Sequence, residues 1–273
     1  MAGQLDDINK NLESMIRVAV SKYEASNRAL QEKSGKLEDA NRRLTEMDKL
    51  KSEFVSIVSH ELRTPLTSII GFAKILMTLK LSDEQKEKYL KVIESEGKRL
   101  AKLVNDFLDI TKIESGTMIF QPVEFDMRDI IREITENFAI SRNISIETKI
   151  PSTPLTVLGD RDRIEQVFLN LLANAARYTP PGEKISLTAE KENDKIKISV
   201  RDYGPGVKKE DIKKIFDKFY RCDDDISKKS RGSGLGLAIA SGIVQMHKGE
   251  LWAESEQASG SIFSFTIPVR TAL

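Results

Sequence analysis

The 273-residue chain lacks most features that mark secreted, membrane-spanning or nucleic-acid-binding proteins. It has a single cysteine, Cys222, so an intrachain disulfide is impossible and a reducing compartment is indicated. No run of about 18 apolar residues is present, and the opening MAGQLDDINK does not resemble a signal peptide. With 43 Lys and Arg against 42 Asp and Glu, the basic excess of a nucleic-acid-binding protein is also missing. We therefore expect a cytoplasmic chain, or the cytoplasmic portion of a membrane receptor, that neither binds nucleic acid nor contacts a membrane.

Glycine and proline are scarce in the first part of the chain and frequent in the second. Up to residue 114, the sequence contains only Gly3, Gly35, Gly71, Gly97 and Pro65. Because both residue types interrupt helices, their scarcity predicts a helical first half. The glycines, prolines and β-branched runs after residue 116 predict a mixed α/β second half.

Two sets of apolar residues at helical spacing run through the first 50 residues. The first set is Leu5, Ile8, Leu12, Met15 and Ala19, and the second, in an offset frame, is Leu30, Leu37, Ala40, Leu44 and Met47. Two heptad frames joined by an offset are typical of a coiled coil with a stutter. A lone amphipathic helix is the alternative, although its apolar stripe would have nothing to pack against.

Two further helices are predicted at 45–78 and 83–113. Ser82 followed by Gln85 indicates a capping box at the start of the second helix, and Gly116 marks its end. Pro65 is expected to bend the first helix. The short link at 79–82 makes the pair an antiparallel hairpin. Since both helices keep apolar surface, two hairpins would pair into a dimeric four-helix bundle.

The second half is predicted to be an α/β sandwich with a mixed sheet packed on helices. Strands are predicted at 119–124, 144–149, 184–191, 195–201, 250–255 and 261–268, and helices at 127–139, 161–177, 208–217 and 235–247. Asp126 and Asp160 are the expected N-caps of the first two of these helices. The strand pair at 184–201 is expected to turn at Asn193 and Asp194.

The string Ser-His-Glu-Leu-Arg-Thr-Pro-Leu at 59–66 contains His60, one of only two histidines. A neutral imidazole nitrogen can act as a nucleophile, and Glu61 follows directly and could accept the proton that is lost. Thr64 lies one helical turn from His60, on the same face. Considered alone, a histidine on a long helix is more often an unreactive surface residue.

Asn170 and Asn174 stand four residues apart in the predicted helix 161–177, so both amides lie on one face. Two ordinary surface amides would have the same spacing. Arg177, one turn after Asn174, adds a cation that could face phosphates, and Tyr178 follows it.

Two glycine-containing segments follow. Asp202 comes directly after an apolar predicted strand, and Gly204 and Gly206 after it allow a tight turn, although ordinary turns have the same pattern. The second segment, at the start of helix 235–247, consists of Gly232, Gly234, Leu235 and Gly236. Free N–H groups at such a helix start bind anions. No strand precedes these glycines, which excludes a Rossmann site, and the Gly-Lys-Ser/Thr of a Walker motif is absent.

In order and spacing, these segments resemble the motifs of the sensor histidine kinases of two-component systems. His-Glu-Leu-Arg-Thr-Pro-Leu is similar to their phosphoacceptor box, and the match continues to about residue 268. The resemblance implies a coiled-coil signalling helix at 1–47, a dimerisation and histidine phosphotransfer domain at 48–116, and a Bergerat-type catalytic ATP-binding domain at 117–273. It also implies a homodimer.

The resemblance assigns roles to the motif residues. ATP phosphorylates His60, and the phosphoryl group passes to an aspartate in the receiver domain of a response regulator. Glu61 is the acid/base partner of His60, and Thr64 orients a water that dephosphorylates the regulator. Asn174 coordinates Mg²⁺, Asn170 lies beside the phosphates and Asp202 accepts from the adenine amine. The remaining implied nucleotide-binding residues are Arg177, Tyr178, Gly204, Gly206, Gly232, Gly234, Leu235 and Gly236.

Three further features are interpreted with the family in view. The charged stretch 222–231 is expected to be a mobile lid over ATP, in which Lys228, Lys229 and Arg231 either reach phosphates or are simply solvated. Ser259-Gly260-Ser261 resembles a final, weak glycine box with a structural role. His247 ends the predicted helix 235–247, where the helix dipole favours a cation, and it is interpreted as structural.

Two alternatives to a kinase stay open. Gyrase, MutL and chaperone ATPases share the ATP-binding fold but place a water-activating glutamate at the position of Asn170, whereas the nearby Glu165 lies off that face. The other alternative is a catalytically dead dimer that binds partners through its coiled coil. The intact Asn174, Asp202 and glycine segments argue against it.

Overall fold

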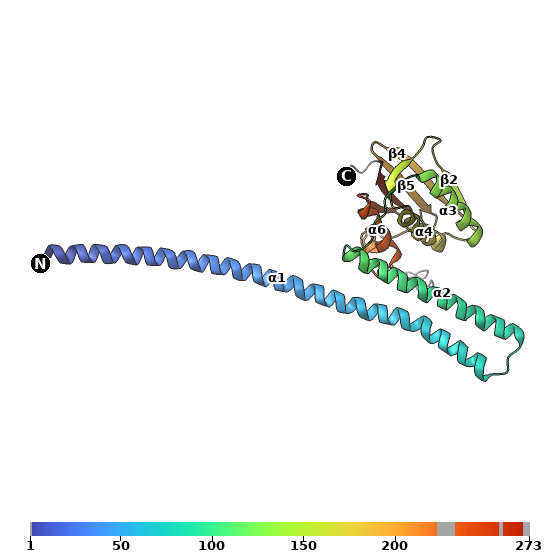
Figure 1. Ribbon diagram of the computed structural model, residues 1–273, viewed down its shortest axis with the longest axis horizontal. Coiled ribbons are helices and arrows are strands. Elements are labelled where there is room, and N and C mark those ends of the chain that lie inside the picture. The colour runs from blue at the N-terminus through green and yellow to red at the C-terminus, as the bar shows by residue number, and fades with distance from the viewer. Residues whose placement is uncertain (1, 223–232, 257–258, 270–273) are drawn as a thin grey trace. The chain divides into compact units, whose positions relative to one another are not determined.

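The computed structural model describes residues 2–222, 233–256 and 259–269 (Figure 1). Before Val55, it describes only some of the side chains. The chain forms two compact units, Met1–His60 and Glu61–Leu273. Within the described ranges, no helix combines the length and the apolar character that crossing a membrane requires.

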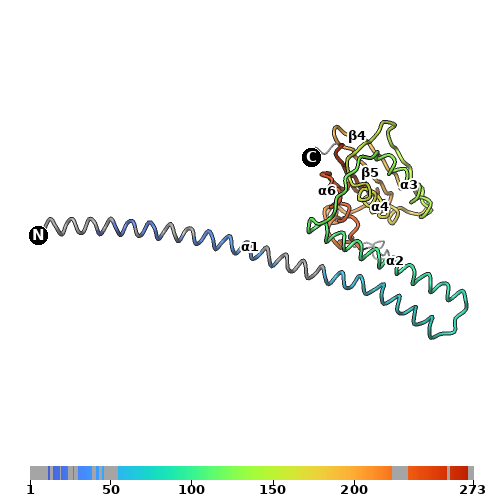
Figure 2. The backbone as a smooth tube through the Cα atoms, viewed as in Figure 1, coloured from blue at the N-terminus to red at the C-terminus, as the bar shows by residue number. Residues whose placement is uncertain are grey.

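The first unit is the greater part of one long helix, α1 (Ala2–Thr78), which is labelled in Figure 2. The helix runs through Pro65 without interruption, and a bend at this proline stays a prediction. Of the two predicted apolar frames, Leu12, Met15, Leu30 and Leu37 are exposed. The side chains of Leu5, Ile8, Ala19, Ala40, Leu44 and Met47 lie outside the described residues. The helix is therefore confirmed, while the coiled coil stays a prediction.

The end of α1 and the following helix, α2 (Asp83–Glu114), form the predicted hairpin. The capping box is present, because the Ser82 hydroxyl accepts from the Gln85 N–H at 3.3 Å and the Gln85 amide oxygen accepts from the Ser82 N–H at 3.0 Å. Phe72 and Tyr89 pack across the hairpin with ring centroids 5.2 Å apart. Gly116, with φ +65°, ends α2 as expected.

The second half contains a five-stranded mixed sheet. Its strands are β2 (Ser145–Lys149), β4 (Lys184–Glu192), β5 (Lys195–Asp202), β7 (Ser261–Pro268) and β6 (Leu251–Ser255), in that spatial order. Only β2 and β4 pair in parallel. Alternate residues of β4 and β5 are buried, so one sheet face forms the core.

Three helices pack on this sheet: α3 (Met127–Arg142), α4 (Arg161–Tyr178) and α6 (Gly236–Met246) (Figure 1). Asp126 and Asp160 cap α3 and α4 as predicted, each accepting from a backbone N–H of the first turn. Phe168 of α4 meets Phe265 of β7 edge to face, with ring centroids 5.4 Å apart. The predicted α/β sandwich is confirmed.

Two predicted elements need correction. The strand predicted at 119–124 is β1 (Val123–Asp126), which pairs with a strand that was not predicted, β3 (Thr156–Gly159). The helix predicted at 208–217 is instead a series of turns with one 3₁₀ helix, η1 (Lys214–Phe216). A tertiary contact here outweighs the local tendency to form a helix. The Tyr220 hydroxyl donates to the buried carboxylate of Asp211 at 2.6 Å. This bond, together with desolvation, raises the pKa of Tyr220 to about 12.

Candidate functional site

A pocket lies within the second unit, between α2, α4, the end of β5 and the start of α6. Most of the predicted nucleotide-binding residues line it: Asn170, Asn174, Arg177, Tyr178, Asp202, Gly206, Gly234 and Gly236. The structure thus brings together segments that lie far apart in the sequence. Gly204 and Leu235 are buried beside the pocket residues and do not line it. Gly232 and the basic residues Lys228, Lys229 and Arg231 lie outside the described residues.

Asn170 and Asn174 reach the pocket from one face of α4, as their spacing predicts. The Nδ2 atom of Asn170 is buried and has no hydrogen-bond partner among the described residues. An unsatisfied buried donor costs about 1–3 kcal/mol, so such an atom in a pocket suits a ligand with acceptor oxygens. The amide oxygen of Asn174 is a hard ligand of the kind that Mg²⁺ prefers.

Asp202 ends β5 and is buried at one side of the pocket. Its Oδ1 accepts from the N–H of Gly204 at 2.9 Å and from the N–H of Ser261 at 3.2 Å. Burial raises the pKa of Asp202, and the two backbone hydrogen bonds oppose that shift. Both bonds end on the same oxygen, which orients the carboxylate as a fixed acceptor. Sequence reasoning found Asp202 but missed the donor role of Ser261.

At two positions beside the pocket, another backbone segment approaches so closely that only glycine fits. A Cβ at Gly204 would lie 2.7 Å from the carbonyl oxygen of Tyr178, so a side chain there would separate β5 from α4. Gly234 has φ +69°, and a Cβ would lie 2.8 Å from the backbone of Phe219. Gly236 is the first residue of α6, beside Asn170. The helix start and the amide face of α4 therefore border the same pocket.

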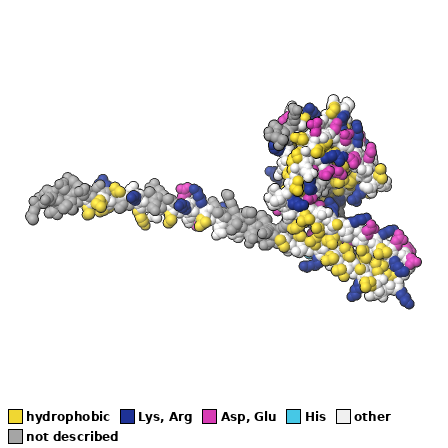
Figure 3. All heavy atoms as spheres, viewed as in Figure 1, with side chains coloured by type: hydrophobic (Ala, Val, Ile, Leu, Met, Phe, Trp, Pro, Cys, Tyr) yellow, Lys and Arg dark blue, Asp and Glu magenta, His cyan; other side chains and the backbone are white. Residues whose placement is uncertain are grey.

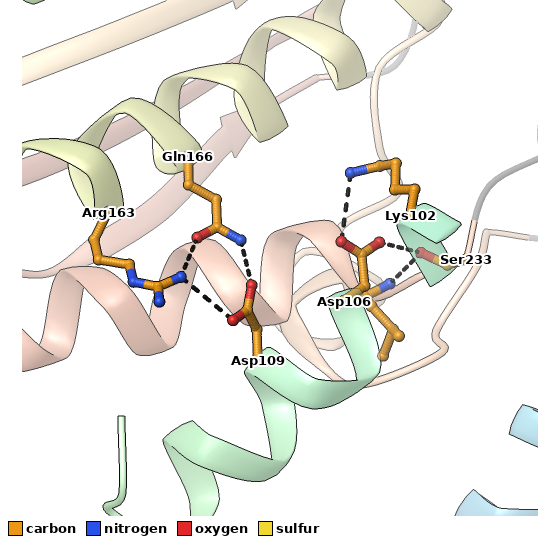
Figure 4. A network of polar contacts seen from close by, with 7 residues as sticks. Lys102, Asp106, Asp109, Arg163, Gln166 and Ser233 are labelled. Atoms are coloured by element: carbon orange, nitrogen blue, oxygen red, sulfur yellow. Dashed lines mark hydrogen bonds and ion pairs between the residues drawn. The ribbon is translucent and has the colours of Figure 1, made fainter. Parts of the chain in front are cut away.

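Four pocket residues come from α2, which sequence reasoning assigned only to the hairpin: Arg99, Lys102, Leu103 and Asp106. Asp106 is buried, and it accepts from the Lys102 ammonium at 3.4 Å and from the Ser233 hydroxyl at 3.4 Å (Figure 4). Burial raises the pKa of Asp106, and the Lys102 charge opposes this shift. No local pattern could have revealed the contact with Ser233.

A second group of contacts joins α2 to α4 three residues further along. The Asp109 carboxylate accepts from Arg163 at 3.3 Å and from the Gln166 amide at 2.7 Å (Figure 4). Nearer the end of α2, the side chain of Ile113 faces Gly242 of α6, where an added Cβ would lie only 2.7 Å from it. In this structure, α2 is therefore packed directly against the α/β half.

The three residues of the predicted phosphoacceptor motif lie on α1. His60 and Thr64 are exposed, and Glu61 is half-buried. The Glu61 carboxylate accepts from the guanidinium of Arg99 at 3.4 Å. Arg99 also lines the pocket, which gives this motif residue a neighbour that the sequence did not indicate.

His247 was expected to be structural, and its burial confirms this role, but the ring is not the cation that the helix dipole would favour. Its side chain is buried, Nε2 accepts from the N–H of Asp160 at 2.9 Å, and Nδ1 lies 2.8 Å from the carbonyl oxygen of Ile243. Since one ring nitrogen accepts, the other carries the only proton and the ring is neutral. Burial lowers the pKa of His247, because desolvation outweighs the hydrogen bonds that favour the charged form.

Two protein-family models match the chain. The first, described as "His Kinase A (phospho-acceptor) domain", matches residues 50–116, and the second, "Histidine kinase-, DNA gyrase B-, and HSP90-like ATPase", matches residues 159–271. Among curated proteins, the sensor histidine kinase WalK of Bacillus subtilis is 36% identical over 229 residues, covering 82% of this chain and 38% of WalK.

Solved structures share the layout. A complex of histidine kinase ThkA with response regulator protein TrrA has a TM-score of 0.63 and 30% identity, covering 80% of this chain and 61% of that one. Full-length ShkA in complex with AMPPNP has a TM-score of 0.60 and 30% identity, covering 81% and 46%. The chain spans about a third of the length of the curated relatives it matches, 32% and 38% for two of them.

Proposed function

Because the chain belongs to the sensor histidine kinases, we propose that it transfers the γ-phosphoryl group of ATP to His60 and then to an aspartate of a response regulator. The observation that carries this proposal is the buried, unpartnered Nδ2 of Asn170 in a pocket that also holds Asp202 and Asn174. We place the signalling coil at 1–47, the dimerisation and phosphotransfer domain at 48–116, and the catalytic domain at 117–273.

The pocket residues suit the parts of ATP. The Asp202 carboxylate accepts from the adenine amine, while Asn170 and Arg177 serve the phosphates and Tyr178 packs near the nucleotide. Among the described residues, no three His, Cys, Asp or Glu side chains group as a metal site. Mg²⁺ commonly takes one or two protein oxygens together with phosphates and water, so the amide oxygen of Asn174 fits it, and the ion would neutralise phosphate charge.

The transfer step needs a nucleophile and a proton acceptor. A neutral nitrogen of His60 attacks the γ-phosphorus, and the bond from that phosphorus to the β–γ bridging oxygen breaks, so that ADP leaves with the bond electrons. The ring proton passes to the carboxylate of Glu61. In the second step, the receiver aspartate attacks the same phosphorus and the histidine nitrogen leaves.

The pocket favours a kinase over an ATPase. Glu165 of α4 does not line the pocket and instead lies 4.0 Å from Arg161, one turn before it. Without a carboxylate from α4, attack by water is slow and the γ-phosphoryl group is kept for His60. We further propose that Thr64 orients a water on the phosphorylated regulator, which would give the protein a phosphatase activity toward its partner.

The exposed apolar surface of the hairpin supports the proposed dimer. Apolar side chains gather on the hairpin in Figure 3. The exposed apolar residues of the hairpin helices include Leu66, Ile70, Met77, Leu90, Val104 and Leu108. On each helix these follow heptad-like spacings, so each helix presents one seam. Two copies pairing along these seams form the proposed four-helix bundle.

Incubation with γ-labelled ATP and Mg²⁺ tests the proposal. A kinase leaves label on the protein that acid removes and base does not, because phosphohistidine is acid-labile. His60→Gln should abolish the label while ATP binding persists. Free labelled phosphate without labelled protein would point to an ATPase. An absence of any turnover would favour the dead scaffold.

A further inference from the structure

Arg99 of α2 connects the phosphoacceptor motif with the pocket. One guanidinium nitrogen donates to Glu61 at 3.4 Å, and another donates to Glu96 at 3.5 Å. The Arg99 side chain is 22% exposed, whereas that of Glu96 is 4% exposed. The same arginine lines the pocket together with Asn170 and Asn174. One cation therefore borders both the proposed proton acceptor and the proposed phosphate site.

The contacts that hold Arg99 are weak ones. Charge-assisted hydrogen bonds between guanidinium and carboxylate groups are typically about 2.7–2.9 Å long. Both contacts of Arg99 are about half an ångström longer than this, and neither is a two-pronged pairing with one carboxylate. A terminal phosphate offers several oxygens with more charge, which the planar fork of arginine binds bidentately. Lys102, one turn further along α2, also lines the pocket and adds positive charge.

We propose that Arg99 is a phosphate-binding residue for ATP that Glu61 occupies when ATP is absent. In the nucleotide-free protein, the guanidinium pairs with Glu61. When ATP binds, the terminal phosphate takes the guanidinium, and Glu61 is released to accept the proton of His60. ADP lacks this phosphate, so Arg99 stays with Glu61 when ADP is bound. The inference rests on the proposed function, because it gives Glu61 and the pocket the roles stated above.

Competition for one cation has a thermodynamic signature. If Glu61 and ATP bind Arg99 in turn, each weakens the affinity of the other by the same factor. Removing the Glu61 carboxylate should then tighten ATP binding, and this gain should vanish when Arg99 is absent. A purely structural role of the ion pair predicts no such gain and no difference between ATP and ADP.

The experiment measures dissociation constants of the β,γ-imido analogue of ATP and of ADP, with Mg²⁺, for the whole chain. Arg99→Ala should weaken binding of the imido analogue by roughly tenfold and change the dissociation constant of ADP by no more than about twofold. Glu61→Ala should tighten binding of the imido analogue by roughly threefold to tenfold and leave the affinity for ADP unchanged. In a protein that also carries Arg99→Ala, it should change neither affinity. Lys98→Ala is the matched control, because this neighbouring cation is exposed and pairs with Glu94.

Three results would overturn the inference: an unchanged ratio of imido-analogue to ADP affinity in Arg99→Ala, equal tightening of both nucleotides in Glu61→Ala, or equal weakening by Lys98→Ala. If Arg99→Ala does not fold, Arg99→Lys decides. Since lysine keeps the charge but loses the fork, it should weaken the imido analogue by roughly threefold, and no change would contradict the proposal. If the wild-type chain labels His60 while these ratios stay flat, only this inference fails. A wild-type chain that binds no nucleotide would refute the proposed function as well.

Discussion

The hydroxyl of Ser233 donates a hydrogen bond to the Asp106 carboxylate at 3.4 Å, across 127 residues of sequence. Ser233 stands between Gly232 and Gly234, in the segment expected to bind phosphate, and Asp106 belongs to α2. A carboxylate therefore lies where a triphosphate would bring negative charge. Packing of α2 in this position and occupation of the pocket by ATP should oppose each other.

Replacing Asp106 with asparagine tests this opposition. Asp106→Asn keeps a side chain that can accept from Ser233 but removes the negative charge, so ATP affinity should rise by roughly threefold to tenfold. Titration calorimetry with ATP and Mg²⁺ measures the change. Asp109→Asn is the control, since Asp109 pairs with Arg163 and does not line the pocket. Equal effects of the two substitutions would mean that the charge of Asp106 does not specifically oppose the binding of ATP.

The proposed recognition of the adenine base by Asp202 can be tested separately from overall nucleotide affinity. Inosine triphosphate carries a carbonyl where adenine carries its amine, so the wild-type protein should bind ATP at least tenfold more tightly, as expected when an acceptor site loses its donor. Asp202→Asn should weaken ATP by roughly tenfold or more and bring the two affinities close together. Competition with a fluorescent nucleotide provides both constants. If Asp202→Asn kept the full preference for ATP over inosine triphosphate, Asp202 would not be the residue that recognises adenine.

The dimer proposal predicts a strong effect of a buried charge on association. Leu108 is 45% exposed in the single chain and belongs to the apolar seam of α2. Leu108→Glu would place an unpaired carboxylate in the bundle, which should weaken dimerisation by roughly a hundredfold or more. Sedimentation equilibrium gives the constant. Lys91→Glu introduces the same carboxylate, with a larger change in charge, beside the seam residue Leu90, at an exposed position that pairs with Glu87, and should leave the dimer largely intact.

Thr64 should matter for the regulator and not for the kinase reaction. It lies one turn from His60 and is exposed, so Thr64→Ala should leave labelling by ATP within about twofold and slow regulator dephosphorylation by roughly tenfold or more. The assay follows loss of label from a purified, phosphorylated receiver domain with ADP present. Thr67→Ala, three residues further along the helix, is the control. Unchanged dephosphorylation in Thr64→Ala would remove this role.

Local chemistry explains what the sequence could predict. Ser82, Asp126 and Asp160 cap their helices through side-chain hydrogen bonds to residues two or three positions away. The local sequence alone was therefore enough to locate these helix starts. Asn170 and Asn174 share a face for the same local reason. The pocket-lining role of these residues followed from the order of the motifs along the chain.

What the sequence could not predict depends on contacts between distant segments. β3 has only four residues, and its pairing with β1 orders a stretch that follows two prolines, Pro151 and Pro154. The contribution of α2 to the pocket needs the packing of α2 on α6 and the hydrogen bonds from α4 to Asp109, which no local period encodes. His247 was interpreted from its position at a helix end, whereas its burial against Asp160 decides its charge.

The neutral state of His247 leads to a prediction about how the stability of the folded chain depends on pH. Burial lowers the pKa of His247 in the folded chain, while the unfolded chain protonates histidine near pH 6.5, as is usual for this side chain at about 25 °C. The stabilising contribution is therefore complete above about pH 6.5 and is lost as the pH falls toward the folded pKa. His247→Gln removes this titration, so its cost, roughly 1–3 kcal/mol at neutral pH, should shrink as the pH is lowered.

Urea unfolding followed by the fluorescence of Trp252, the only tryptophan, reports on the α/β half in which His247 lies. Comparison of wild type and His247→Gln at about pH 7.5 and about pH 5.5 gives the two differences in unfolding free energy. The difference should be smaller at the lower pH. A cost of His247→Gln that does not change with pH would mean that the ring is not held neutral by burial.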